Sequence, residues 1–202
     1  MIIRRVPREV TEAAEHYLHA TYIDHVRSAQ ATAPRPGRLL RSTTVLGAYD
    51  SESASRQSCF LRLISVVEAY VDIICAILFR EASPSMDDLV RRLVENAELR
   101  ASTTWQERRD AFSGYHNIRL GELARWSELD AGIEVRNAIA HGLGELTPLQ
   151  RKGAAARKIG QIGVSLSDGR VLITDKSLQH CRDVCIAFIR SLDAAMPSPE
   201  QS

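Results

Sequence analysis

The sequence predicts a mostly α-helical bundle with a small C-terminal β-hairpin, and three observations support this fold class. Aromatic residues form only 5% of the chain, whereas the helix-favouring residues Ala, Leu, Arg and Glu are frequent. Apolar residues recur at helical spacing along most of the 202 residues. The pattern changes only near residues 162–174, where two β-type runs flank Ser167-Asp168-Gly169, a turn sequence typical of hairpins.

The expected helices are delimited by capping residues, prolines and glycines. Asp50 or Ser51 is suited to cap the longest helix, and Pro84 ends it. Thr104, with Glu107 three residues later, has the spacing of a capping box and opens another helix. In chain order, the expected helices cover about residues 8–30, 51–83, 85–100, 105–114, 121–141, 148–158 and, capped by Asp175, 176–195.

The chain is expected to divide into three parts. Residues 1–50 are predicted to form an N-terminal helix and a linker, because prolines and a glycine interrupt the helical pattern after residue 30. Residues 51–195 are predicted to form the main helical domain. Its longest helix is apolar nearly all round over residues 61–78, as expected of a helix in the centre of a bundle. The Pro/Ser-rich residues 196–202 are predicted to be a disordered tail.

Composition and charge exclude several classes of protein. The net charge is +1, so the chain as a whole does not attract nucleic acid, and an RNA-binding role needs a local basic patch. The N-terminal apolar stretch is too short and too charged for a signal peptide. The longest apolar run, residues 66–79, contains Glu68 and Asp72 and is shorter than the roughly 20 residues of a membrane span. The sequence therefore predicts a cytoplasmic protein that does not enter a membrane.

The cysteines and histidines give little support for a metal or another cofactor, and we expect neither. No C-x-x-C pair occurs, and most of the cysteines lie in apolar runs, so free, buried core thiols are expected. Zinc binding is the weaker alternative. Glu15, His16 and His19 could form a metal site, but a solvated helix face is the simpler interpretation. The cysteines are Cys59, Cys75, Cys181 and Cys185.

The helix expected at residues 121–141 carries a polar constellation near its C-terminal end. At roughly 100° per residue, four polar residues share one face: Asp130, Glu134, Asn137 and His141. Arg136 lies instead near the centre of an arc that faces the core or a partner subunit. The apolar members of this arc are Trp126, Leu129, Ile133, Ala140 and Leu143. A charged guanidinium there must be paired or line a cleft, and Glu68 or Asp72 is a candidate supporting partner.

Arg136, Asn137 and His141 have the chemistry that RNA cleavage without a metal requires. A base must activate the 2′-OH, an acid must protonate the leaving 5′-oxygen, and a cation must stabilise the phosphorane. Histidine titrates near neutral pH and serves as acid or base, while arginine binds phosphate in a forked geometry. Because one chain supplies one such histidine, a second copy across a two-fold axis would complete the acid–base pair.

The segment Arg136-Asn137-Ala138-Ile139-Ala140-His141 resembles the R-x4-6-H motif of HEPN domains, in its R-N-x3-H form. The order of elements over roughly residues 55–194 is also similar to that family, although only the motif is specific. The resemblance implies an α-helical bundle that dimerises and builds a composite site from two motifs. It also implies a metal-independent endoribonuclease that leaves a 2′,3′-cyclic phosphate, with Arg136 and His141 catalytic and Asn137 supporting.

Members of this family occur in toxin–antitoxin pairs, phage-defence systems and CRISPR effectors. The resemblance therefore implies a homodimeric toxin or antiphage effector that acts on RNA, with an antitoxin or a defence-system protein as partner. One alternative is a non-catalytic HEPN module that binds RNA, a nucleotide or a protein. Another is a plain helical interaction subunit of a larger complex.

Other basic and aromatic residues are weaker candidates for RNA contact. Four basic residues just after the motif are candidates for contacts with an RNA backbone, although exposed basic residues on a short helix are ordinary: Arg151, Lys152, Arg157 and Lys158. Trp105 and Trp126 could stack on bases, but packing in a core or interface is favoured. The neighbouring Arg108 and Arg109 are both expected on a solvated helix face.

Overall fold

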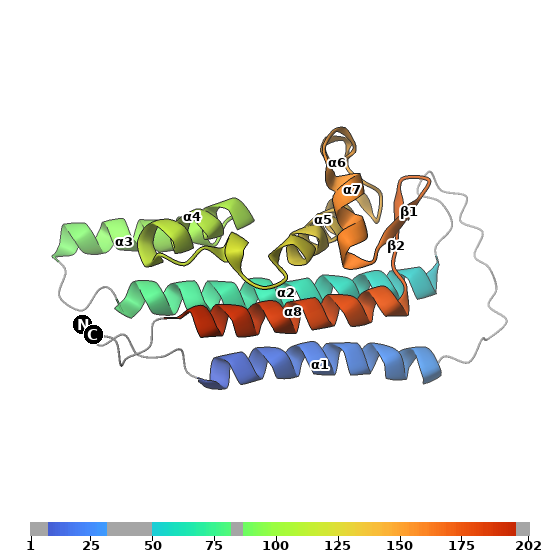
Figure 1. Cartoon of the computed structure of the whole chain (residues 1–202), viewed down its shortest axis with the longest axis horizontal. Helices are drawn as coiled ribbons and strands as arrows, with labels where there is room; N and C mark the ends of the chain where they lie inside the picture. Colours follow the sequence, from blue (N-terminus) through green and yellow to red (C-terminus); the bar gives the residue numbers. More distant parts are fainter. Residues whose placement is uncertain (1–7, 32–49, 82–86, 197–202) are drawn as a thin grey trace. The chain divides into compact units, whose positions relative to one another are not determined.

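The computed structural model describes residues 8–31, 50–81 and 87–196. Within these ranges the chain forms eight α-helices, two short 3-10 helices and one antiparallel hairpin, which confirms the predicted fold class. None of the helices in these ranges has both the length and the apolar character of a membrane span. The elements labelled in Figure 1 and the two 3-10 helices are α1 (Arg8–Ala31), α2 (Ser51–Glu81), α3 (Asp88–Ala101), α4 (Trp105–His116), η1 (Leu120–Glu122), α5 (Trp126–Gly142), α6 (Pro148–Lys152), α7 (Ala155–Lys158), η2 (Ile159–Ile162), β1 (Ser165–Ser167), β2 (Arg170–Leu172) and α8 (Asp175–Ala195).

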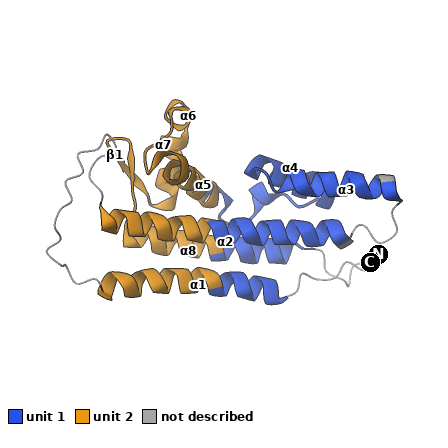
Figure 2. Ribbon diagram, turned by 180° about the vertical axis from the view of Figure 1, so that it is seen from behind, with its two compact units in different colours: residues 1–16, 65–127, 186–202 blue, residues 17–64, 128–185 orange. Residues whose placement is uncertain are grey.

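The chain forms two compact units, which Figure 2 colours separately. Helices α1, α2 and α8 each contribute residues to both units. The predicted division at residue 50 stays a prediction. The predicted linker and tail lie almost entirely outside the described residues. Unit 1 comprises residues 1–16, 65–127 and 186–202, and unit 2 comprises residues 17–64 and 128–185.

In unit 1, a polar network connects α1, α2 and α8. The Thr11 hydroxyl on α1 donates to Asp193 Oδ1 on α8 at 3.0 Å. Since this donation uses its one proton, Thr11 accepts from the Tyr70 hydroxyl on α2 at 3.1 Å. Burial raises the pKa of Tyr70 to about 12, so the phenol keeps the proton that it donates. The network thereby fixes α1 against the two long helices of this unit.

Helix α4 is joined to α2 in unit 1 by a two-pronged ion pair. Arg108 Nε and Nη2 donate to the two carboxylate oxygens of Asp72, each at 2.8 Å. Arg108 is only 7% exposed, so the prediction of a solvated Arg108 is wrong, whereas Arg109 is exposed as expected. One turn before Asp72, Glu68 accepts a hydrogen bond from Trp105 Nε1 at 3.0 Å. Glu68 and Asp72 of α2 thus both contact the first turn of α4.

The C-terminal end of α4 carries a half-buried histidine, His116. The His116 ring packs edge-on against Phe79 of α2, with the ring centroids 4.8 Å apart. Its Nε2 atom has no hydrogen-bond partner among the described residues. Burial lowers the pKa of His116 below its usual value of 6.5, because a charged imidazole here would lack water.

We expect His116 to make the protein less stable in mild acid. Between the normal pKa near 6.5 and the lower folded-state pKa, the unfolded chain binds more protons, so stability falls as the pH falls. His116→Phe keeps an aromatic ring and removes this titration. Urea unfolding at about pH 7.5 and about pH 5.5 should show a smaller acid-induced loss for His116→Phe than for wild type. The exposed control His19→Phe leaves the His116 ring in place, and an equal loss in all three proteins would contradict the prediction.

In unit 2, α2 lies between α1 and α5 (Figure 1). The Cys59 thiol on α2 contacts the Thr21 carbonyl on α1 at 3.9 Å. A Cβ atom at Gly132 of α5 would lie 3.0 Å from Ile64 Cδ1, so the absence of a side chain lets α5 approach α2 closely. The predicted apolar side of α8 is confirmed, because every one of its residues is 0% exposed: Leu178, Cys181, Val184, Cys185, Phe188, Ile189 and Leu192.

The hairpin of unit 2 is confirmed at the predicted turn. Asp168 and Gly169 have φ of 50° and 80°. Two consecutive positive φ values are typical of the tight hairpin turns whose twist matches that of the flanking strands. Strands β1 and β2 pair with Ser165 opposite Leu172. The hairpin also pairs with the chain that leaves α5, since Val171 N–H donates to the Gly144 carbonyl at 2.8 Å.

Three predicted helix boundaries are wrong for local reasons. Helix α5 begins at Trp126 and not near residue 121, because Arg125 adopts a left-handed φ of 63° that a helix cannot contain. The single basic helix predicted after residue 147 is two short helices that are interrupted at Gly153. Thr174 caps α8 in place of Asp175, through a hydrogen bond from the Ser177 N–H at 3.1 Å.

Candidate functional site

The motif occupies the last two turns of α5 and ends at a sharp exit from the helix. Gly144 N–H donates to the Ala138 carbonyl at 3.1 Å, so the chain folds back over the helix end. Leu143 and Gly144 have φ of 51° and 91°, which places two consecutive residues in the left-handed region. Glycine adopts this region freely, whereas a leucine is strained there. The strain lies two residues beyond His141.

The motif residues divide between the core and the surface. Ala138 and Ile139 are 0% and 6% exposed and pack inward. Arg136 and Asn137 are half-buried, and His141 is exposed. Arg136 Nη1 donates to Asn137 Oδ1 at 3.2 Å, so the structure brings the predicted cation and the supporting amide together. Within the described residues, the exposed His141 side chain makes no hydrogen bond or ion pair.

The arc that contains Arg136 is covered only along its first half. Leu129 is 0% exposed and Ile133 is 7% exposed, so the N-terminal part faces the core as predicted. Ala140 is exposed and Leu143 is 63% exposed, so the C-terminal part is open. We call Ala140 and Leu143 the open arc. Because half-buried Arg136 lies between the covered half and the open arc, it borders the surface.

The polar face of α5, formed by Asp130, Glu134, Asn137 and His141, is partly covered by α6 and α7. Lys158 Nζ lies 2.5 Å from Asp130 Oδ2 and 3.9 Å from Glu134 Oε1. Glu134 also accepts a hydrogen bond from Gln150 Nε2 at 2.8 Å. The first half of the polar face is thus engaged by the segment that follows the motif.

The predicted RNA-contacting residues differ in their surroundings. Lys158 is half-buried in its ion pair with Asp130, so its charge is already compensated. The other three, Arg151, Lys152 and Arg157, are exposed and form no ion pair within the described residues. We call these three the basic triplet. Its charges are available to bind a polyanion. RNA contact by the triplet stays a prediction.

The predicted supporting acids lie in unit 1. The contacts described above join Glu68 to Trp105 and Asp72 to Arg108. Whether either carboxylate also supports Arg136 stays a prediction. Trp105 and Trp126 are both half-buried and pack edge-on, with ring centroids 5.8 Å apart. This packing agrees with the favoured structural interpretation of the two tryptophans.

The cysteines are free and buried, as predicted. Burial raises the pKa of the Cys59 thiol to about 11 and that of Cys75 to about 12. Burial also raises the pKa of Cys181 well above its usual value. These thiols stay protonated near neutral pH, which makes them poor nucleophiles. Among the described residues, no group of three His, Cys, Asp or Glu side chains is arranged to hold a metal ion.

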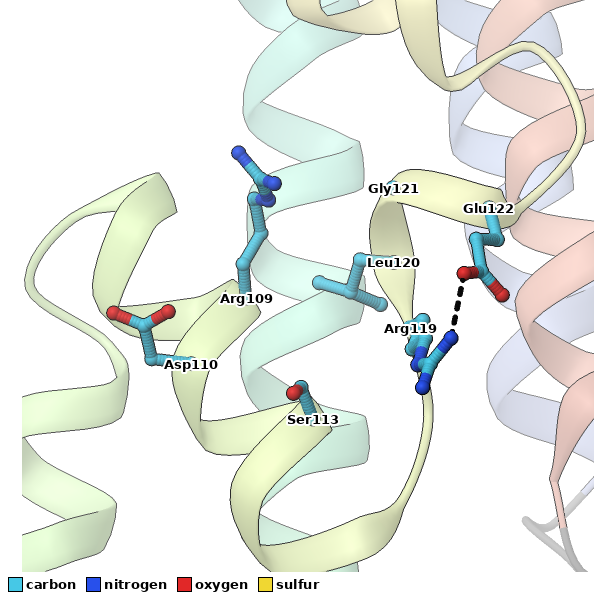
Figure 3. Close-up of a pocket in the computed structure, with 7 residues that line it drawn as sticks. All are labelled: Arg109, Asp110, Ser113, Arg119, Leu120, Gly121 and Glu122. Atoms are coloured by element: carbon cyan, nitrogen blue, oxygen red, sulfur yellow. Dashed lines mark hydrogen bonds and ion pairs between the residues drawn. The ribbon is translucent and has the colours of Figure 1, made fainter.

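Sequence reasoning missed a shallow cleft in unit 1. A cleft of about 360 Å³ lies between α4 and η1, as Figure 3 shows. Arg119 pairs with Glu122 at 2.9 Å in its wall, and the Arg109 guanidinium lies 5.5 Å from the centre of the Trp126 ring. The cleft was missed because residues 120–122 form a 3-10 turn where the sequence predicts the start of a helix. It shares no lining residue with the motif.

Comparison with protein-family models, with curated proteins and with solved structures finds no significant match. The resemblance to HEPN domains therefore depends on the motif and on the order of elements. Its functional consequences stay predictions.

Relief of the strain at Leu143 is expected to stabilise the protein. A non-glycine residue in the left-handed region costs about 1 kcal/mol, so Leu143→Gly should raise the free energy of unfolding by about that amount. Leu149, which is 82% exposed, provides the control, because Leu149→Gly removes a similar exposed side chain in helix α6. Urea unfolding measures both variants at a protein concentration at which wild type is monomeric, so that a contact of Leu143 with a second chain does not enter the comparison. Equal or lower stability of Leu143→Gly relative to wild type would contradict the assignment of strain.

Proposed function

We propose that this protein is a metal-independent endoribonuclease of the HEPN type that acts in the cytoplasm as a toxin or antiphage effector. His141 serves as acid or base, Arg136 stabilises the charge on the phosphorane, and Asn137 orients the guanidinium. The proposal derives from the motif and its resemblance to HEPN domains, and the surroundings of these three residues support it.

The single observation that carries the proposal is the exposure of the motif. His141 is exposed, and Arg136, five residues earlier on the same helix, is half-buried. If Arg136 served only the fold, we would expect its side chain to be buried in the core. If His141 served only the fold, we would expect a carboxylate to pair with it. The hydrogen bond from Arg136 to Asn137 also holds a forked donor near the surface.

The proposed active form is a homodimer in which two motifs share one composite site. The open arc offers an apolar contact next to Arg136, since Ala140 is exposed and Leu143 is 63% exposed. Leu149, exposed by 82% on α6, extends the exposed apolar surface of this unit. An exposed apolar surface is a candidate contact for another chain where such residues are contiguous. A two-fold contact there would give each site a second histidine.

Incubation with labelled RNA in EDTA tests the proposal. We expect wild-type protein to cut the RNA and leave 2′,3′-cyclic phosphate ends, because 2′-OH attack produces them and no metal is needed. His141→Ala should be inactive. Cleavage by both proteins would refute the site assignment. Cleavage by neither would favour the alternative of a non-catalytic module that binds RNA, a nucleotide or a protein.

A further inference from the structure

Gln150 is an unusually buried polar residue next to the candidate site. It is 8% exposed, although glutamine is mostly an exposed residue. Its Nε2 donates to the carbonyl and to the carboxylate of Glu134 on α5, each at 2.8 Å. Its Oε1 accepts from the N–H of Thr147 at 3.1 Å and from its hydroxyl at 3.2 Å. The side-chain amide therefore uses all its donors and acceptors to join the start of α6 to α5.

The segment held by Gln150 depends on such anchors for its position. Helices α6 and α7 have only 5 and 4 residues, which is too short for a helix to be stable by itself. Gln150 fixes the beginning of this segment, and the ion pair from Lys158 to Asp130 fixes its end. The basic triplet lies on the segment between the two anchors.

The Lys158 anchor also partly compensates the negative charge of the polar face. Glu134 lies seven residues before His141, about 10 Å along the helix at 1.5 Å per residue. Uncovered, the carboxylates of Asp130 and Glu134 would repel an RNA phosphate near the motif. Lys158 pairs with both carboxylates, and Gln150 donates a hydrogen bond to Glu134. The segment that carries the basic triplet is thereby held at the polar face of α5.

We propose that Gln150 is a positioning residue that holds the basic triplet beside the polar face, where its side chains contact the phosphates of a single-stranded RNA. The identity of this ligand rests on the proposed ribonuclease function. Gln150 itself need not touch the RNA. Its removal eliminates no charge, so any electrostatic consequence must arise from displacement of the triplet.

The salt dependence of RNA binding tests this inference. Affinity for a labelled single-stranded RNA oligonucleotide is measured over a series of NaCl concentrations, in a His141→Ala background so that the RNA stays intact. Each phosphate contact contributes about 0.7 to the slope of log affinity against log salt. Replacement of the whole triplet by alanine should therefore lower the slope by about 2. Gln150→Ala should reproduce at least half of that decrease, and Gln179→Ala, an exposed control on α8, should not change the slope.

Two further measurements keep the inference falsifiable. Trypsin should cut after Arg151 and Lys152 faster in Gln150→Ala than in the control, because α6 is released. If Gln150→Ala does not fold, Thr147→Val removes the hydroxyl that donates to Gln150, eliminates no charge and leaves the contacts of Gln150 with Glu134 intact.

The outcomes separate this inference from the proposed function. Unchanged slopes in Gln150→Ala and Thr147→Val, an unchanged slope without the triplet, or no RNA binding would each overturn the role of Gln150. A wild-type protein that binds RNA with the expected slopes but never cuts it would overturn the ribonuclease proposal alone.

Discussion

Arg136→Ala is expected to slow RNA cleavage by about 100- to 1,000-fold, the usual effect of removing one charge-stabilising donor from an active site. The half-buried guanidinium already donates to Asn137 and is therefore preorganised at the surface of the motif. A preorganised cation stabilises developing charge without reorganisation during the reaction. Initial rates of cleavage of labelled RNA, measured at saturating and at low substrate concentration, would give the decrease in kcat and in kcat/KM.

Two further variants distinguish a catalytic arginine from a merely positive one. Arg136→Lys keeps the charge but loses the planar fork, so we expect it to recover little of the activity. Arg27→Ala removes an exposed arginine of α1 in the same unit and should cleave as wild type does. Light scattering and thermal unfolding should show that all three variants keep the fold and oligomeric state of wild type. Wild-type rates in a folded Arg136→Ala protein would exclude Arg136 from the chemistry.

Arg108→Met is expected to lower the free energy of unfolding by about 3 kcal/mol, the low end of the range for breaking a buried ion pair. The guanidinium is nearly buried and binds both oxygens of Asp72, at 2.8 Å each. The Asp72 side chain is 35% exposed, so water partly compensates the carboxylate that remains, which is why we expect the low end. Arg108 also lies 5.3 Å from the centre of the Trp105 ring, and this contact is lost too.

A double variant tests whether the cost comes from the unpaired carboxylate. Asp72→Leu combined with Arg108→Met leaves no buried charge, and we expect it to be more stable than Arg108→Met alone. The exposed pair of Arg119 and Glu122 serves as control, because Glu122→Ala should cost less than about 1 kcal/mol. Urea unfolding supplies all the values. An equal loss of unfolding free energy in Arg108→Met and Glu122→Ala would show that the buried pair stabilises the fold no more than the exposed pair does.

The parts of the fold that depend on short-range patterns are predictable from the sequence. The apolar side of α8 repeats at helical spacing, and all its members are fully buried. The start of α5 depends instead on a distant partner, since the Ala124 N–H bonds to the Ser191 hydroxyl, 67 residues away. Arg108 and Arg109 are indistinguishable in sequence, and only the position of Asp72, 36 residues earlier, makes one of them a core residue.

The same distinction holds for the candidate site. The spacing of Asn137 and His141 on one helix face follows from the helical period. The partners of the acidic half of that face, Gln150 and Lys158, depend on how the chain turns back after Gly144, which no local pattern specifies. The exposure of the open arc, Ala140 and Leu143, depends on which neighbouring elements end before they cover these residues. Such properties belong to the packed structure.

Because all four thiols are buried, their reactivity reports when the structure around each one opens locally. Cys75 belongs to unit 1, whereas the other cysteines belong to unit 2. A folded chain shields these thiols from alkylating reagents, and each becomes reactive only when its surroundings open. Variants that keep Cys75 alone or Cys59 alone would therefore show by their labelling rates whether the unit with the motif opens more readily than the unit without it.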